Sequence, residues 1–137
     1  MLDKKLFKEV DYALLFTFVF FFIFIGNLSN LEVIKNIFEG ILKRPKATYL
    51  SSIILSQFIS NVPCAILLSG FSHNYKELLL GVDIGGMGTL IASLASVISY
   101  KFYANEYKQD KKKYLLKFSI YNFAALLLFS LIFWFII

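Results

Sequence analysis

The sequence predicts an all-α membrane protein, and two observations predict that class. Apolar residues make up 58% of the 137 residues and charged residues only 17%, whereas soluble domains carry about 25% charge. The charged residues are also segregated from long apolar runs. A disordered chain, a disulfide scaffold and an ordinary soluble enzyme are therefore excluded. Because a span needs roughly 20 apolar residues, the chain holds about three or four membrane segments.

The first half of the chain begins with a short polar lead-in, Met1 to Asp11. An uncharged run at 12–28 follows and is predicted to be a full span, at the lower limit of the ~17–25 residues that cross a bilayer. Residues 30–46 alternate apolar and polar side chains at helical spacing, which predicts an amphipathic helix at the membrane interface. Asn30 is expected to cap this helix and Pro45 to end it.

The segment 47–72 is long enough to cross the membrane once, but its centre is polar. Gln57, Ser60, Asn61 and Pro63 lie there, and exposed backbone at membrane depth is tolerated only inside protein or at an aqueous cavity. Two interpretations follow from the residues. One is a single kinked span. The other is a re-entrant hairpin that turns at residues 60–63.

A second interruption lies in the next apolar segment. The run GVDIGGMGT at 81–89 contains four glycines, and each glycine costs about 1 kcal/mol relative to alanine inside a helix. Residues 78–103 are therefore predicted to form one broken span. The Lys-rich loop 104–117 follows, and 118–137 is predicted to be an uninterrupted span.

The distribution of Lys and Arg predicts the orientation. With a hairpin at 47–72, nine positive residues share the side of the Lys-rich loop and five lie on the other side; with a full span the division is ten to four. Both arrangements place loop 104–117 in the cytoplasm. The charge distribution slightly favours the full span.

The two polar interruptions are the best candidates for a functional site. A helix broken inside the membrane frees carbonyl groups at one end and N–H groups at the other, and paired breaks of this kind mark transport sites. The alternative is a proline kink with glycine packing notches and no ligand. Groupings typical of hydrolases or metal sites are absent from the sequence, which argues against an enzyme.

The same two segments resemble a known family. The run SQFISNVPCAILLSGFS at 56–72, followed by LLLGVDIGGMGTLIASLASVISYKFY at 78–103, resembles the C-terminal part of the ion transporter superfamily. That superfamily includes arsenite-pump-like, citrate-transporter-like and sodium/dicarboxylate carriers. The resemblance is strongest to the bacterial anion permeases with a citrate-transporter-like domain, and the opening run at 10–28 shares it.

The resemblance implies a re-entrant hairpin at 47–72 whose Ser-Asn tip faces the unwound glycine loop. It also implies three transmembrane helices, one of them broken, and an interfacial helix at 30–46 that connects the scaffold to the moving part. The implied residues for substrate or ion are Ser60, Asn61, Pro63, Asp83, Gly85, Gly86, Gly88 and Thr89. Na⁺ is expected at Ser60, Asn61 and Thr89. The family commonly has Asn where this chain has Asp83. An acid there would either bind a proton or cation, which slightly favours a proton as the coupling ion, or cap the glycine turn at the water boundary.

The resemblance covers only the second of the family's two repeats. The expected function is therefore transport of a carboxylate or oxyanion by a partial or split secondary permease of the inner membrane, coupled to Na⁺ or H⁺. Expected partners are the bilayer, a small anionic substrate, and an N-terminal transporter half or a second copy. Nucleic acid is not expected to bind, and no resident cofactor is expected. The alternative is a small structural or accessory membrane protein without transport activity.

Overall fold

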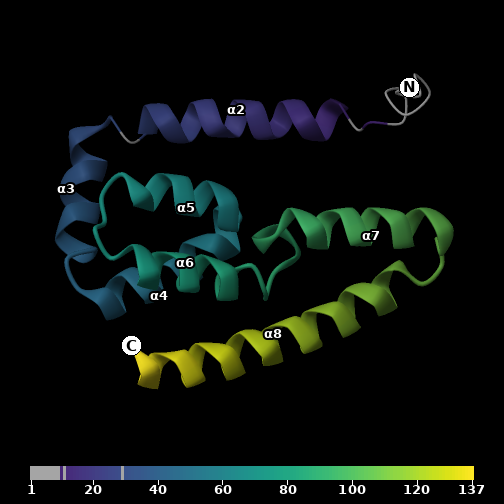
Figure 1. Ribbon diagram of the computed structural model, residues 1–137. Helices are drawn as coiled ribbons and strands as arrows, with labels where there is room; N and C mark the ends of the chain where they lie inside the picture. The colour runs from purple at the N-terminus through teal and green to yellow at the C-terminus, as the bar shows by residue number, and fades with distance from the viewer. Residues whose placement is uncertain (1–9, 11, 29) are drawn as a thin grey trace, which may run out of the picture.

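The chain is helical throughout the part that the computed structural model describes, which is residues 10, 12–28 and 30–137. Those residues form seven α-helices and one 3₁₀ helix (Figure 1). In chain order they are α2 (Tyr12–Leu28), α3 (Glu32–Ile41), α4 (Pro45–Ile59), α5 (Asn61–Ser69), α6 (Tyr75–Gly85), η1 (Leu90–Ala92), α7 (Leu94–Glu106) and α8 (Lys111–Ile136). The all-helical prediction is confirmed for this part of the chain.

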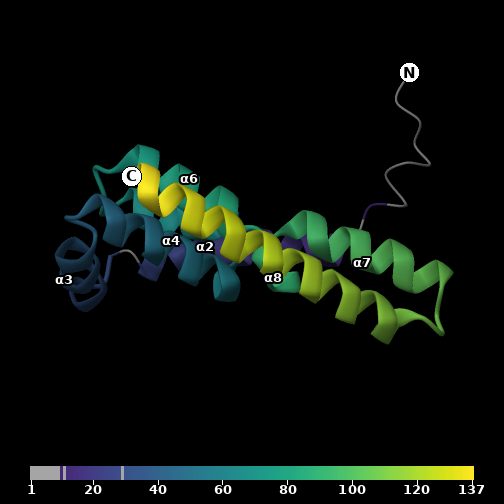
Figure 2. The same ribbon diagram turned by 90° about the horizontal axis from the view of Figure 1, so that it is seen from below.

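Three helical segments run along the length of the molecule. They are α2, α8, and α6 followed by α7. Figures 1 and 2 both place the start of α2 and the α7–α8 loop at one end of the molecule, and α3 and the end of α8 at the other. Helices α4 and α5 occupy only the half nearer α3. The break between α6 and α7 therefore lies near the middle of the molecule, beside the turn between α4 and α5.

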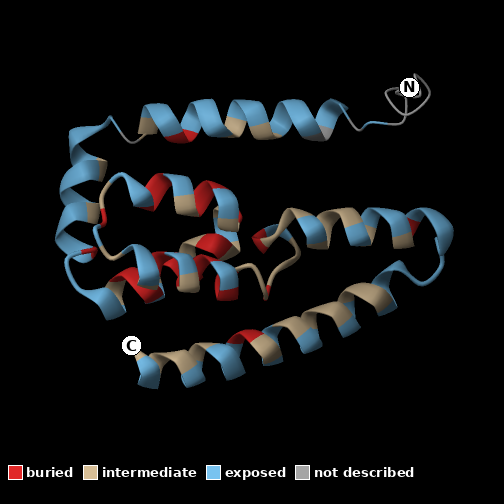
Figure 3. Cartoon of the chain, viewed as in Figure 1, coloured by how far each residue is buried: buried red, intermediate tan, exposed pale blue. Residues whose placement is uncertain are grey.

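Helices α4 and α5 fold back on each other as a hairpin, and α6 packs against both. The Thr48 and Ser72 hydroxyl oxygens, 24 residues apart, approach to 3.4 Å. Buried residues are concentrated in these three helices (Figure 3), where Tyr49, Cys64 and Leu68 are fully enclosed. The hairpin and α6 are thus the most tightly packed part of the structure.

Small residues allow α4 and α6 to pack this closely. Thr48, Ser52, Ser56 and Ser60 recur every four residues of the chain, and all four are buried. Each of the two middle serines donates its hydroxyl to the carbonyl four residues earlier, at 2.8 and 2.7 Å. Their hydroxyl groups are therefore hydrogen-bonded within α4, and their short side chains let the neighbouring helix approach closely.

A hydrogen-bonded cluster closes the base of the hairpin. The Asn74 amide donates to the Leu42 carbonyl at 2.8 Å and to the Thr48 hydroxyl at 3.1 Å. The Thr48 hydroxyl itself donates to the Leu42 carbonyl at 3.0 Å. These bonds join the chain before α4 to the chain before α6, so both ends of the hairpin lie at the same end of the molecule.

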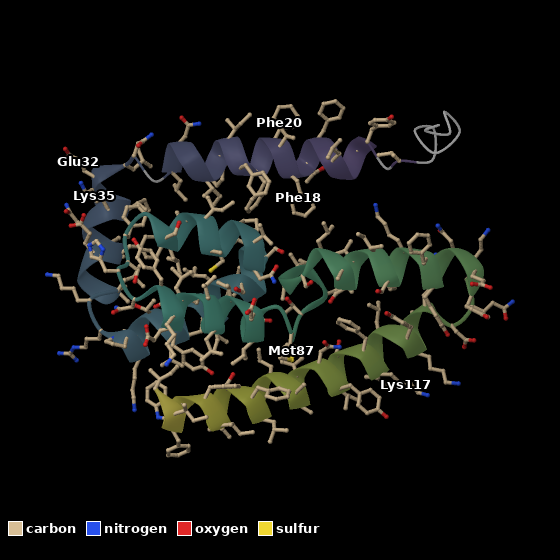
Figure 4. The ribbon with its side chains drawn as sticks, in the orientation of Figure 1. Phe18, Phe20, Glu32, Lys35, Met87 and Lys117 are labelled. Carbon is tan, nitrogen blue, oxygen red and sulfur yellow. The ribbon has the colours of Figure 1, made fainter. Side chains whose placement is uncertain are left out.

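The two long outer helices pack on opposite sides of this unit. α2 contacts α5, while α8 contacts α6 and α7. Figure 4 shows Phe18 on the side of α2 that faces α5 and α7, and Phe20 on the opposite side. On α8, the Ser130 carbonyl accepts a hydrogen bond from the Tyr49 hydroxyl at 3.2 Å. Most side chains of both helices stay exposed, as expected for surfaces that face lipid.

Two predicted helix boundaries are wrong. The residue before α3 is Leu31, with no side-chain cap, because Asn30 donates its amide to the Gly26 carbonyl at the end of α2 instead. The last carbonyls of a helix need such donors. Pro45 begins α4 rather than ending α3, since a first helical position needs no N–H donor. The polar lead-in, apart from Val10, lies outside the described residues.

One helix in the described part, Lys111–Ile136, is long and apolar enough by itself to cross a membrane. A second candidate is added if Leu15–Leu28 and Glu32–Ile41, which are bent by 84°, are taken together as one span. The structure therefore supports one or two candidate spans by length and composition.

Candidate functional site

The hairpin turns at a single residue, Ser60. Its φ of 73° and ψ of 154° belong to a region that is essentially reserved for glycine, and it is the one non-glycine residue with positive φ in the described part. Such a conformation costs about 1–3 kcal/mol and persists only where surrounding contacts impose it. The predicted turn over residues 60–63 is thus too wide, because Asn61 to Pro63 form the first turn of α5. A proline is tolerated there.

The glycine-rich segment ends α6 and opens a short loop. α6 ends at Gly85, and residues 86–89 lead into η1 before α7 begins at Leu94. Gly88 has a φ of 103°, and a Cβ added there would overlap the side-chain amide of Gln57. Gly88 is therefore required both by the backbone conformation and by the neighbouring side chain.

Gln57, on the last turn of α4, ties this loop to the hairpin. Its side-chain amide donates to the Gly85 carbonyl at 2.7 Å and to the Met87 carbonyl at 3.0 Å. Its carbonyl oxygen accepts from the Thr89 N–H at 3.0 Å. The Thr89 hydroxyl completes the set by donating to the Gln57 backbone carbonyl at 2.9 Å. The Gln57 side chain therefore satisfies three backbone groups at the break in the helix.

Ser60 and Asn61 lie beside the same loop. The Asn61 side chain rests against Gly86, where an added Cβ would come within 3.0 Å of its amide nitrogen. The Ser60 hydroxyl makes a long contact of 3.4 Å to the Ala92 carbonyl. The structure thus brings together the hairpin tip and the loop, as the resemblance implies, and places both near the middle of the molecule (Figure 1).

Pro63 and Asp83 are placed differently from the other candidates. Pro63 is fully buried in the first turn of α5. The Asp83 side chain is exposed on α6 and has no hydrogen bond or ion pair with the part of the chain that the structure describes. Among the described residues, the Asp83 side chain therefore forms no hydrogen bond to the Ser60–Asn61 tip.

The hairpin tip borders an apolar cavity beside α2. A cavity of about 220 Å³ lies between α2, the hairpin tip and the start of α7, and it is lined mainly by residues such as Phe18, Phe21 and Ile91, with Ser60 at its wall. Among the described residues, no three His, Cys, Asp or Glu side chains lie together in a group that would suit a metal ion. The polar groups on offer are neutral oxygens and backbone carbonyls, which suit a monovalent hard cation better than a soft metal.

Gln57 is the residue whose importance the sequence did not reveal. In the sequence it is one of the four residues that make the centre of segment 47–72 polar. Its spacing was informative: Gln57 lies three residues before Ser60, so on a helix both side chains project toward the same face. The loop partners of Gln57 are 28 to 32 residues away, and no local pattern could identify them.

Comparison with known proteins supports a membrane transporter relationship. Over 93 residues the chain is 43% identical to the uncharacterized transporter MJ0456 of Methanocaldococcus jannaschii, a match that covers 68% of this chain and 26% of that protein. Over 134 residues it is 31% identical to the inner membrane protein YbiR of Escherichia coli, covering 96% of this chain and 34% of that protein. The chain is partly homologous to membrane transporters.

The matches also define how far the relationship extends. The chain spans about a quarter to a third of the length of these curated relatives. Neither relative is named as an enzyme. No protein-family model matches the chain, and no solved structure matches it.

Proposed function

We propose that the chain is the C-terminal repeat of a secondary permease of the ion transporter superfamily. It would carry a small anion, a carboxylate or an oxyanion, across the inner membrane, with Na⁺ or H⁺ as the coupling ion. The observation that carries the proposal is the meeting of two chain breaks, at Ser60 and at residues 86–89, held together by Gln57. Paired breaks at mid-depth are the usual construction of transporter sites.

The proposed membrane arrangement is based on the three helical segments that run along the length of the molecule. α2, the α6–α7 pair and α8 cross the bilayer, α3 lies at the interface, and α4–α5 enters and leaves on the side of α3. At about 1.5 Å per residue, the 15 residues of α4 are about 22 Å long, too short for a ~30 Å hydrocarbon layer. Loop 104–117 then lies in the cytoplasm.

In this proposal the coupling ion binds neutral oxygens between the hairpin tip and the loop. The Ser60 and Thr89 hydroxyls and the Asn61 amide oxygen are the side-chain ligands. Loop carbonyls add to them, because a carbonyl that accepts one hydrogen bond keeps a second lone pair.

The anionic substrate is proposed to bind beside the coupling ion. Helix α5 begins at the tip, and the positive end of its dipole favours an anion there. A first repeat, from another chain or a second copy, would supply the opposite half of the site.

A second candidate is a structural membrane protein without a ligand. It is favoured by one observation, which is that the polar groups at the breaks already satisfy one another through Gln57. Uptake measurements separate the two candidates.

Uptake is best measured in a chimera in which this chain replaces the matching region of the E. coli inner membrane protein, so that the rest of a full-length relative is present. We expect Asn61→Ala and Gly86→Leu to lower uptake of labelled citrate, succinate or sulfate by roughly tenfold or more. Both substitutions disrupt the contact between the hairpin tip and the loop, and contacts of this kind contribute several kcal/mol to binding at the site. Matched controls are Asn27→Ala, whose amide bonds only its own helix, and Gly26→Leu, which meets open space. Equal uptake in site variants and controls contradicts the proposal.

Cysteine labelling tests the hairpin in the membrane. Lys43 and His73 are exposed and line one groove at the base of the hairpin, whereas the native Cys64 is buried and is removed as Cys64→Ala. A membrane-impermeant maleimide is expected to label Lys43→Cys and His73→Cys from the same, outer side. Lys111→Cys should react only after the membrane is opened. Labelling of Lys43→Cys and His73→Cys from opposite sides would establish a single kinked span instead.

A further inference from the structure

A groove at the Lys-rich end of the molecule has no role in the proposed transport site. It measures about 470 Å³ and lies between α7 and the start of α8. Its walls combine Tyr103, Tyr114 and Phe118 with the cationic side chains of Lys113 and Lys117. The groove therefore offers aromatic surface and positive charge together.

The aromatic wall is held in place by ring contacts between the two helices. Tyr103 of α7 stacks on Tyr114 of α8 with ring centroids 4.5 Å apart, and Tyr114 stacks in turn on Phe118 at 6.0 Å. Tyr107 extends the stack, 5.0 Å from Tyr103. Because aromatic pairs of this kind add stability beyond their buried area, the groove is formed before any ligand arrives.

The positive charge in the groove is not neutralised by ion pairs. Neither Lys113 nor Lys117 forms a salt bridge with any residue in the described part of the chain, where the single salt bridge joins Lys35 and Glu39. Asp110 is the one acid in the lining. The two lysines and Tyr121 recur every four residues of α8, so they share one helix face. Figure 4 shows Lys117 extending from α8 into open space.

The position of the groove indicates what it binds. It lies at the start of the helix that can cross a membrane, which is the depth of phospholipid headgroups. Past Tyr121, the same face of α8 presents Leu128 and Ile132, both exposed. A ligand with an anionic head and an apolar tail matches this order of charged, aromatic and aliphatic residues.

We infer that this groove binds the headgroup of an anionic phospholipid. The phosphodiester is held by the ammonium groups of Lys113 and Lys117 with the Tyr121 hydroxyl as a further donor, and an acyl chain follows the aliphatic face of α8. Basic pockets between transmembrane helices on the cytoplasmic side bind headgroups in this way. The inference rests on the groove and on α8 crossing the membrane, and it does not depend on transport activity.

The test is native mass spectrometry of the chain in detergent, with phosphatidylglycerol and phosphatidylcholine of identical acyl chains added in equal amounts. We expect a clear preference for phosphatidylglycerol, and we expect Lys113→Gln/Lys117→Gln to reduce it roughly tenfold or more. The matched control is Lys111→Gln/Lys112→Gln, which removes the same charge outside the groove and should keep the preference. Circular dichroism checks that both variants fold.

Three outcomes would overturn the inference. An equal loss of the phosphatidylglycerol preference in the two double variants would mean that the lysine run as a whole, and not the groove, attracts the lipid. Equal binding of the two lipids to the unmodified chain would remove the need for anionic charge. Displacement of the lipid by millimolar glycerol phosphate would show that free phosphate is enough and that the groove is not selective for a membrane lipid.

Discussion

Replacing Gly81 by alanine is expected to destabilise the chain, although alanine is the better helix former. A Cβ at this position would lie 2.6 Å from Ser52 Cβ and 2.6 Å from the Tyr49 carbonyl oxygen. One of these neighbours is backbone, so α4 and α6 must move apart. Overpacking of this kind costs about 1–3 kcal/mol, against a gain of at most about 1 kcal/mol in helix propensity.

The matched control is Gly40→Ala on α3. Gly40 is also helical, but nothing lies within 4 Å of a Cβ added there. The same substitution is therefore expected to raise stability by about 0.5–1 kcal/mol. Thermal unfolding in detergent measures both. Changes of the same sign in the two variants would show that α4 and α6 do not meet at Gly81 as described.

Replacing Gln57 by leucine is expected to release the loop from the hairpin. The variant removes the donor for the Gly85 and Met87 carbonyls and the acceptor for the Thr89 N–H. Each partly buried group left without a partner costs about 1–3 kcal/mol, so the total loss is several kcal/mol. Leucine is similar in size to glutamine, so the effect reports on the hydrogen bonds rather than on volume.

Hydrogen–deuterium exchange gives a readout specific to this site. The Thr89 amide is expected to be protected in the unmodified chain and to lose protection in Gln57→Leu. Gln57→Glu should keep part of that protection, because a carboxylate still accepts from the Thr89 N–H but cannot donate to the carbonyls. Gln109→Leu, at an exposed position, is the control. Unchanged exchange in Gln57→Leu would contradict the assigned role of Gln57.

The sequence predicted the breaks in the chain better than it predicted the turn between them. Polar residues in an apolar run identified residues 57–63, and clustered glycines identified residues 81–89. The sequence predicted a turn over residues 60–63, yet Pro63 lies within a helix and Ser60 alone makes the turn with a positive φ. An unfavourable backbone angle on a serine has no signature in sequence, because contacts elsewhere impose it.

The roles of the glycines could also be predicted only in part. Their clustering predicted a helix interruption at 81–89, and α6 does end within that run, at Gly85. Gly81, however, lies inside α6 and serves close packing against Ser52. Glycine both breaks helices and lets helices pack closely, because it has no side chain. Which of these two roles a given glycine has depends on the helix that packs against it.

By itself the sequence determined the helical class, the two interruptions and the charged end of the molecule, because composition and periodicity act locally along the chain. Only the tertiary structure decided that the hairpin arms return to the same end, through Thr48, Ser72 and Asn74. It also decided that Gln57 joins the two interruptions, across 28 to 32 residues of chain. Hydrogen bonds between distant backbone groups depend on how helices pack, and that information is spread over the whole chain rather than held in any one segment.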